Sequence, residues 1–158
     1  MSLARLALAA VAAAAFATAA HGAEAQRITG VVELFTSQGC NSCPPADAVL
    51  EELGQQPDVI ALGYHVDYWD YIGWKDSFAQ AAFTARQEAY ATVAGSNTIY
   101  TPQILVGGVD PVIGAHGMEV MEKIGQHTAV PATVTLRLEP LPGGMRILAQ
   151  GLRRVRIG

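Results

Sequence analysis

The strongest constraint on the fold is a strand–helix–strand pattern in the first half of the chain. Residues 28–36 (ITGVVELFT) are nearly all β-branched or apolar, which predicts a strand buried on both faces. Pro44 and Pro45 open a helix whose apolar residues recur at helical spacing up to Gly54. Residues 59–66 predict a second buried strand. A connection of this length implies parallel strands joined by a right-handed crossover.

The rest of the chain predicts a helix, a hairpin, a second helix and a second hairpin. Asp76 is a candidate cap for a long helix over residues 77–94. Gly107-Gly108 is a turn signal between two short apolar runs, which predicts an antiparallel hairpin. The expected ranges are 103–106 and 109–113 for this hairpin, 117–126 for the last helix, and 132–140 and 145–157 for strands around the turn LPGG.

The N-terminus has the pattern of a secretory signal peptide. Arg5 is followed by an Ala-rich apolar run over residues 6–20, and Ala23-x-Ala25 offers a cleavage site. No later stretch reaches the ~18 apolar residues of a membrane span. We therefore expect a periplasmic or secreted protein with no membrane span after residues 1–25 are removed.

The remaining chain is long enough for one domain with its own core and too short for two. We assign residues 26–130 to this domain and residues 131–158 to the start of a C-terminal β extension. The strand-like pattern continues to Ile157, which would leave an edge that a complete protein normally covers. We therefore expect the chain to be a truncated piece of a longer protein.

Charge is unevenly distributed. Residues 28–130 carry three basic side chains against twelve acidic ones, whereas residues 131–158 carry five arginines against one glutamate. An acidic body argues against nucleic acid as a partner. The arginines at 153, 154 and 156 are typical of the solvated face of a strand.

Cys40 and Cys43 are the only cysteines, and they lie between the first strand and the first helix. A disulfide between them closes only a small loop and stabilises little, so the pair predicts chemistry rather than a scaffold. A Cys-x-x-Cys pair can be a redox dithiol or part of a metal site. Haem attachment is excluded because Pro44 stands where that motif needs histidine.

Four segments, in order, resemble a bacterial family of secreted thioredoxin-like proteins of uncharacterised function: ELFTSQGCNSCPPAD, HVDYWDYIGWKD, FTARQEAY and YTPQILVGG. The resemblance implies an α/β thioredoxin-like fold, with a central mixed sheet flanked by helices and followed here by a C-terminal β-hairpin extension. It also implies that Pro102 is a cis-proline that faces the dithiol, with Thr101 before it.

Thiol–disulfide exchange needs a thiolate that attacks and a second sulfur that resolves the mixed disulfide. A helix N-terminus lowers the pKa of a cysteine placed there, so we expect Cys40 to be the exposed nucleophile. Cys43, one turn into the helix, is then the resolving cysteine. Asn41 and Ser42 offer only neutral donors, which predicts a moderate lowering of the pKa of Cys40.

Glu33 interrupts the apolar run of the first strand. Burial would raise the pKa of its carboxyl group, and by analogy with the buried aspartate of thioredoxin it could take the proton from Cys43. It stands one position earlier relative to the dithiol than that analogy requires. The alternative is a glutamate at a solvated edge or paired with a base.

His65 and Asp67 follow the second strand, at the end of the sheet where α/β proteins bind ligands. We expect them near Cys40, where they could tune the thiolate or hold a substrate. Trp69 and Trp74 belong to an aromatic loop that could form the apolar wall of a substrate groove. The alternative is that the loop packs over the sheet edge and His65 is structural.

The sequence favours an exported thiol–disulfide oxidoreductase that acts on protein or small-molecule thiols and disulfides and needs no cofactor. One alternative is copper(I) binding or delivery, because two thiolates suit that ion. A structural zinc site lacks the second pair of ligands, so no resident metal is expected. Another alternative is a noncatalytic ligand-binding module. Hydrolase and phosphate-loop motifs are absent from the sequence.

Overall fold

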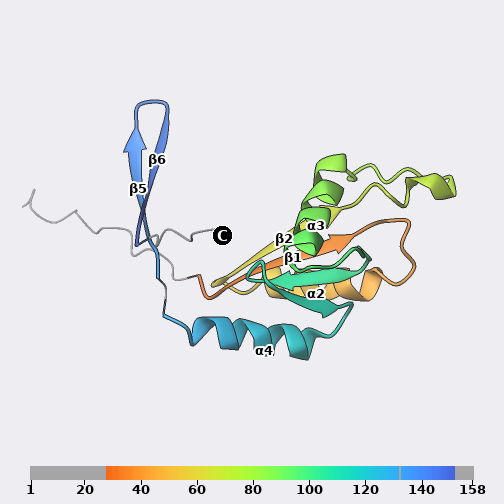
Figure 1. Ribbon diagram of the computed structural model, residues 1–158, viewed down its shortest axis with the longest axis horizontal. Helices are drawn as coiled ribbons and strands as arrows, with labels where there is room; N and C mark the ends of the chain where they lie inside the picture. The colour runs from red at the N-terminus through yellow and green to blue at the C-terminus, as the bar shows by residue number, and fades with distance from the viewer. Residues whose placement is uncertain (1–27, 132, 152–158) are drawn as a thin grey trace, which may run out of the picture.

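Strand β1 (Gly30–Thr36) lies inside a four-stranded mixed sheet. In the computed structural model the strand order is β2-β1-β3-β4 (Figure 1). β2 (Val59–His65) runs parallel to β1, as predicted, whereas β3 (Gln103–Val106) pairs antiparallel with β1. β4 (Asp110–Ile113) pairs antiparallel with β3. Side chains of β1 are buried on both faces of the sheet, which confirms the interpretation of its apolar run.

The structure describes residues 28–131 and 133–151. The signal peptide expected at residues 1–25 and the arginines at 153, 154 and 156 lie outside these residues. Within the described ranges, no helix is long and apolar enough to cross a membrane.

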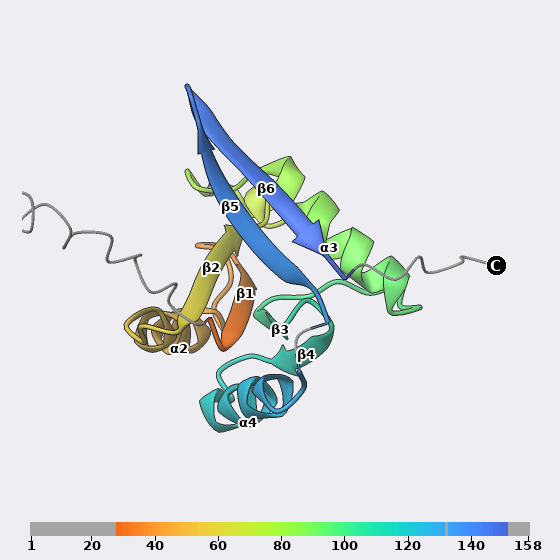
Figure 2. The ribbon, with the colours of Figure 1, turned by 90° about the vertical axis from the view of Figure 1, so that its left-hand side faces the viewer.

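Three helices cover the sheet. α2 (Pro44–Gly54) and α4 (Gly117–Thr128) lie against one face, and α3 (Ala81–Val93) lies against the other (Figures 1 and 2). We call these the α2 face and the α3 face. The main core is on the α2 face and consists of Val32, Leu34, Ala46, Leu53, Val59, Ile104, Val106, Val112, Val120 and Ile124. A smaller core on the α3 face contains Phe35, Val66 and Leu105, with Tyr64, Tyr68, Trp69 and Tyr90 packed against it.

Two expectations about these elements are wrong. β2 is the edge strand of the sheet and is only partly buried, because no described strand pairs with its outer side. α3 begins at Ala81 rather than at residue 77. The Asp76 carboxylate accepts the Phe78 N–H, but it also binds two groups outside this segment and does not start the helix.

The turn between β3 and β4 is as the sequence predicts. Gly107 and Gly108 have φ of 61° and 74°, a backbone conformation that other residues rarely adopt. A Cβ at Gly107 would also lie 2.8 Å from the imidazole ring of His127 on α4. The glycine therefore permits both the turn and the close approach of α4.

β5 (Thr135–Leu141) and β6 (Gly144–Gln150) form a separate two-stranded hairpin, which projects away from the sheet in Figure 1. The register places one apolar face on it, made of Leu136, Leu138, Pro140, Met145, Ile147 and Ala149. The strand order, the position of the cysteines before α2 and the hairpin β3–β4 confirm a thioredoxin-like α/β fold with a C-terminal β-hairpin.

Candidate active site

The two cysteines lie in the loop that joins β1 to α2, and they form a disulfide with a Cα–Cα distance of 5.4 Å. The loop folds as two consecutive turns. The Cys40 N–H donates to the Ser37 carbonyl at 3.1 Å, and the Cys43 N–H donates to the Cys40 carbonyl at 3.1 Å. The end of β1 and the start of α2 therefore position both sulfur atoms.

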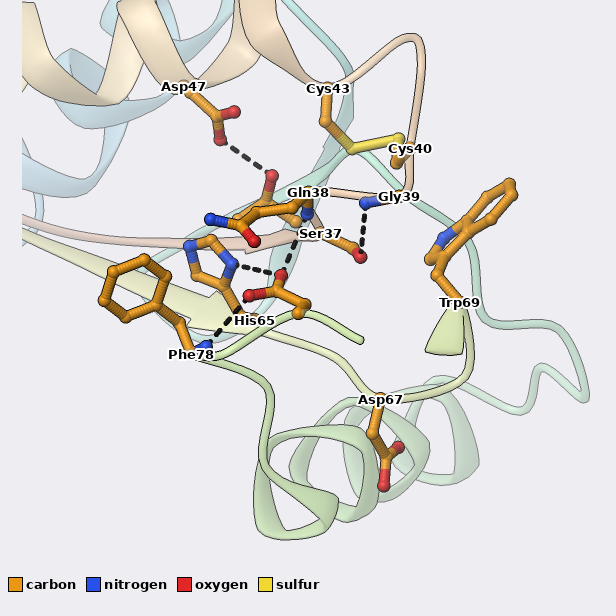
Figure 3. A network of polar contacts seen from close by, with 12 residues as sticks. Ser37, Gln38, Gly39, Cys40, Cys43, Asp47, His65, Asp67, Trp69 and Phe78 are labelled. Atoms are coloured by element: carbon orange, nitrogen blue, oxygen red, sulfur yellow. Dashed lines mark hydrogen bonds and ion pairs between the residues drawn. A yellow bond between two sulfur atoms is a disulfide. The ribbon is translucent and has the colours of Figure 1, made fainter. Parts of the chain in front are cut away.

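The expectation of an exposed Cys40 is wrong for this disulfide form. Cys40 is 3% exposed and Cys43 is 0% exposed. The loop that follows β2 packs on the residue before Cys40: a Cβ built on Gly39 would lie 3.1 Å from Ile72 Cδ1 and 3.1 Å from Trp69 Cβ. In Figure 3 the side chain of Trp69 stands beside Cys40. Of the two cysteines, only Cys40 keeps any accessible surface.

The start of α2 also differs from expectation. Cys43 is the N-cap residue rather than a residue one turn into the helix. Pro44 and Pro45 have no N–H, and the N–H groups of Ala46 and Asp47 both donate to the Cys43 carbonyl, at 2.9 and 3.0 Å. The first four residues of the helix therefore offer a cysteine thiolate no free N–H group. The helix dipole is what remains to stabilise it.

One side-chain donor lies at the first cysteine. The Ser42 hydroxyl is 3.5 Å from Cys40 Sγ, and it is the donor because the sulfur of a disulfide carries no hydrogen. This is one of the neutral donors that the sequence predicts between the two cysteines. It can also donate to Cys40 once the disulfide is reduced.

The Thr101–Pro102 peptide bond is cis, which confirms what the family resemblance implied about this bond. Pro102 is buried, and its carbonyl accepts the Gly114 N–H at 3.1 Å. The Thr101 hydroxyl accepts a hydrogen bond of 2.8 Å from the indole N–H of Trp69. The aromatic loop after β2 is thus joined to the segment that enters β3.

Glu33 is not the proton acceptor that we expected for Cys43. It lies on the α3 face, where Arg86 Nη2 is 2.6 Å from one carboxylate oxygen and the Tyr90 hydroxyl donates to the other at 2.6 Å. The strand alternation turns Leu34 toward the α2 face instead. The alternative that the sequence left open, a glutamate paired with a base, is what the structure contains.

The environment of the Glu33–Arg86 ion pair also changes the pKa of Tyr90, which donates a hydrogen bond to Glu33. Burial, and then the hydrogen bond to the Glu33 carboxylate, raise the pKa of Tyr90 to about 12. Tyr90 is therefore protonated at neutral pH and remains a hydrogen-bond donor to Glu33.

Asp76 is a buried carboxylate that connects β2 to the loop before the dithiol. It accepts the Gln38 N–H at 2.8 Å and the Phe78 N–H at 2.9 Å, and His65 Nδ1 lies 2.6 Å from it (Figure 3). Burial alone would raise the pKa of Asp76, but these hydrogen bonds outweigh burial and hold the pKa below its usual value. An ionised Asp76 accepts only, so Nδ1 of His65 carries the proton.

The candidate groove residues fall into two groups. Trp69 lies beside Cys40, and Trp74 donates its indole N–H to the side chain of Gln38 at 3.3 Å. Asp67 instead accepts the Thr84 hydroxyl at 2.6 Å and points away from the disulfide in Figure 3. His65 is half-buried and bound to Asp76, as in the structural alternative.

Sequence reasoning missed Gln87, which is fully buried on α3. Its amide nitrogen donates to the Tyr100 carbonyl at 2.7 Å and to Gln103 Oε1 at 2.8 Å, and its amide oxygen accepts the Tyr68 hydroxyl at 3.2 Å. One side chain thus joins the aromatic loop to both flanks of Thr101–Pro102. The signal was present in FTARQEAY, where polar residues are interspersed with apolar ones on a helix that faces a core.

Sequence reasoning also missed Asp47, which lies one helical turn beyond Cys43 on α2. The buried hydroxyl of Thr36, the last residue of β1, donates to its carboxylate at 2.7 Å. This contact joins the strand to the helix that carries the dithiol. Among the residues that the structure describes, no group of three or more His, Cys, Asp or Glu side chains is arranged to hold a metal ion.

Comparison with known proteins places this site in a family context. A crystal structure of protein AGR_C_4864 from Agrobacterium tumefaciens is 41% identical over 77% of this chain, with a TM-score of 0.68. The chain spans 55% of that protein, or about half of its length. A thioredoxin from Malassezia sympodialis (Mala s 13) aligns at 22% identity over 65% of this chain and 78% of its own, with a TM-score of 0.41. No curated protein matches.

Residues 31–150 match the family described as "protein of unknown function (DUF1223)", and this range includes the dithiol, the aromatic loop, Thr101–Pro102 and the whole β5–β6 hairpin. The match covers well over half of the sequence. The chain therefore belongs to this family.

Proposed function

We propose that the protein is an exported thiol–disulfide oxidoreductase that acts through Cys40 and Cys43. The observation that carries the proposal is the disulfide at the start of α2 in a thioredoxin-like sheet. A pair this close in sequence adds little stability, so its value to the protein is chemical.

The exchange reaction follows from the accessibility of the two sulfur atoms. A substrate thiolate attacks Cys40 Sγ, because Cys43 has no accessible surface. The Cys40–Cys43 bond breaks, a mixed disulfide forms on Cys40, and Cys43 leaves as a thiolate. A second substrate thiolate then attacks the substrate sulfur and releases Cys40. The substrate becomes a disulfide, and its two electrons reduce the protein; the reverse sequence reduces a substrate disulfide.

The surroundings of the dithiol favour the reducing direction. Strong oxidants of this fold stabilise their reduced thiolate, which raises the reduction potential. Here Pro44 and Pro45 supply no N–H groups, and the Ser42 hydroxyl is a neutral donor. We therefore expect a potential nearer to about −270 mV than to about −120 mV.

The first test is the reduction potential of the Cys40–Cys43 pair. The protein without residues 1–25 is equilibrated in graded thiol buffers, and its free thiols are trapped with a mass tag. A two-electron midpoint supports the proposal, and its value reports the direction of electron flow. A pair that never titrates would contradict the proposal and favour copper(I) binding.

Two serine variants test the roles of the two sulfurs. We expect Cys40→Ser to lose exchange completely, because no accessible sulfur remains. We expect Cys43→Ser to accumulate a mixed disulfide on Cys40, because the resolving thiol is gone. Full function of Cys40→Ser would instead indicate a noncatalytic binding module.

Export rests on the signal-like pattern of residues 1–25. The test is fractionation of a bacterial host that expresses the chain with a C-terminal tag. We expect a processed product in the periplasm or medium, and a cytoplasmic product when residues 1–25 are deleted. An unprocessed product that stays in the cytoplasm would contradict export and leave the redox proposal standing.

A further inference from the structure

The loop between β2 and α3 exposes four large apolar side chains within eight residues. Tyr71 is 81% exposed, Ile72 47%, Trp74 62% and Phe78 61%. We call these four residues the aromatic rim. Single exposed apolar side chains are common, but a cluster of them often marks a binding surface.

The rim is held in place by polar contacts at its base. Asp70 accepts the Asp76 N–H at 3.1 Å, and Asp76 in turn accepts the N–H groups of Gln38 and Phe78. Trp69 is bonded to Thr101 on the other side of the loop. Because the loop is already ordered, a ligand of the rim would not have to supply the free energy of ordering it.

The rim adjoins the dithiol loop through two of its residues. Ile72 lies over Gly39, the residue before Cys40, and the indole of Trp74 donates to the side chain of Gln38. A substrate cysteine bonded to Cys40 would therefore bring its neighbouring residues next to Ile72 and Trp74. Apolar neighbours would lose contact with water there, which is favourable.

The charge of the domain separates two classes of thiol. Residues 28–130 carry twelve acidic side chains against Lys75, Arg86 and Lys123, and Arg86 and Lys123 are ion-paired with Glu33 and Asp110, so the domain has a net negative charge although Lys75 lies in the rim segment. Glutathione has a net negative charge and no apolar side chain, so the net negative charge of the domain disfavours its approach and it makes no apolar side-chain contact with the rim. A neutral or cationic peptide with apolar residues is not repelled by the negative charge and can make apolar contacts with the rim.

We infer that the aromatic rim binds apolar side chains next to a cysteine in an unfolded polypeptide, so that protein thiols and disulfides, rather than glutathione, are the preferred substrates. This inference rests on the proposed oxidoreductase function. It adds the substrate class and the residues that select it.

The chemical step in the test is a single turnover of the oxidised protein. A peptide thiolate attacks Cys40 Sγ, the Cys40–Cys43 bond breaks, and Cys43 leaves as a thiolate. A second peptide thiolate attacks the peptide sulfur of the mixed disulfide. The products are the peptide disulfide and the reduced protein, so two electrons pass from the peptides to the protein and no other oxidant is needed.

The experiment compares two blocked pentapeptides, each with one cysteine and one lysine. The cysteine is flanked by leucine and phenylalanine in the first and by serines in the second. Glutathione is a third thiol. The rate of loss of the Cys40–Cys43 disulfide is measured by quenched-flow trapping, and each rate is divided by that of the same thiol with a small disulfide reagent. This division removes differences in intrinsic thiol reactivity.

We expect the oxidised protein to react about tenfold faster with the apolar peptide than with the serine peptide, which corresponds to about 1.4 kcal/mol shared by the two apolar side chains. In the double variant Ile72→Ala/Trp74→Ala this ratio should fall to near one. Val93→Ala is the matched control, because Val93 is 89% exposed on α3 and belongs to no part of the site. Its ratio should equal that of the parent protein.

Three results would overturn the inference, and they are distinguishable. Equal normalised rates for the two peptides in the parent protein would show that the rim does not select apolar neighbours. An equal decrease in the reaction rates of both peptides in the double variant would show that the rim affects only the geometry of the loop. If neither peptide nor glutathione, each supplied in large excess over the protein, reduces the disulfide, the proposed function itself fails.

Discussion

The α2 face of the sheet is packed almost entirely with aliphatic side chains, whereas the α3 face is joined largely through polar ones. Ten buried apolar residues form the core between the sheet, α2 and α4. Across the sheet, only Phe35, Val66 and Leu105 form the buried apolar core, and the Glu33–Arg86 pair and the Gln87 amide lie beside them.

Apolar packing and hydrogen bonds have different roles in positioning the site. Apolar packing is non-directional, so it fixes α2, and with it the dithiol, against the sheet as a rigid unit. Hydrogen bonds are directional, and on the α3 face they connect loops that have little core of their own. Gln87 reaches the aromatic loop and the Thr101–Pro102 segment. The α2 face therefore positions the sulfurs, and the α3 face positions the walls around them.

The largest effect should come from a cavity in the aliphatic core. Leu34→Ala removes a fully buried side chain on the α2 face and should lower the free energy of unfolding by about 2–5 kcal/mol. Urea denaturation measures this change. Leu138→Ala, on the exposed hairpin, is the control and should change stability by about 0.5 kcal/mol or less. Equal effects of the two variants would contradict the assignment of the core.

The next effect should come from breaking the ion pair on the α3 face. Arg86→Leu leaves the buried Glu33 carboxylate with the Tyr90 hydroxyl as its remaining partner. The free energy of unfolding should fall by about 3 kcal/mol. The exchange rate of Glu33→Gln should match that of the parent protein, because Glu33 lies across the sheet from α2. Stopped-flow exchange with dithiothreitol checks this. A large rate loss in Glu33→Gln would restore the proton-acceptor role that we reject here.

Gln87→Leu should affect both stability and rate. It leaves the Tyr100 carbonyl and the Tyr68 hydroxyl without their partner, at a cost of about 1–3 kcal/mol. Displacement of the Thr101–Pro102 segment should also slow exchange roughly tenfold under conditions where the variant is folded. Thr92→Ala, at the exposed end of the same helix, serves as control. A normal rate in folded Gln87→Leu would mean that the polar contacts of α3 support stability alone.

A smaller effect should appear in acid. The pKa of Asp76 lies lower in the folded protein than its usual 3.8, so the folded state binds fewer protons at this site than the unfolded state. Its contribution to stability is complete above the unfolded pKa and is lost as pH falls through the folded pKa. Denaturation from pH 6 to pH 2 should show this loss, and Asp76→Asn should flatten it. An unchanged acid profile in Asp76→Asn would contradict the assignment.

The smallest effect should come from Trp69→Phe. This variant keeps an aromatic ring beside Cys40 but removes the hydrogen bond to the Thr101 hydroxyl, worth about 0.5–1.5 kcal/mol, and the second ring of the indole. Thermal unfolding should show a small decrease in Tm. If the decrease exceeds that of Gln87→Leu, the indole rather than the Gln87 amide is the main link between the two loops.

Much of the architecture followed from local sequence patterns. The apolar run of β1, the prolines that open α2 and the Gly-Gly turn before β4 each specify their element through backbone preferences that do not depend on distant residues. The exposure of β2 could not be derived in this way. A run of apolar residues fits a central strand as well as an edge strand, and only the strand order distinguishes the two.

Some features of the candidate site were also predictable from the sequence, and others were not. The sequence by itself determined the dithiol and its place before a helix, because these depend on residue identity and spacing, and the resemblance of its motifs to a family identified Pro102. Only the tertiary structure decided the direction of Glu33, the burial of Cys40 and the contacts of Asp76 and Gln87. The face on which a strand residue lies changes with a shift of one position, and a buried polar side chain finds its partners across segments that are distant in sequence.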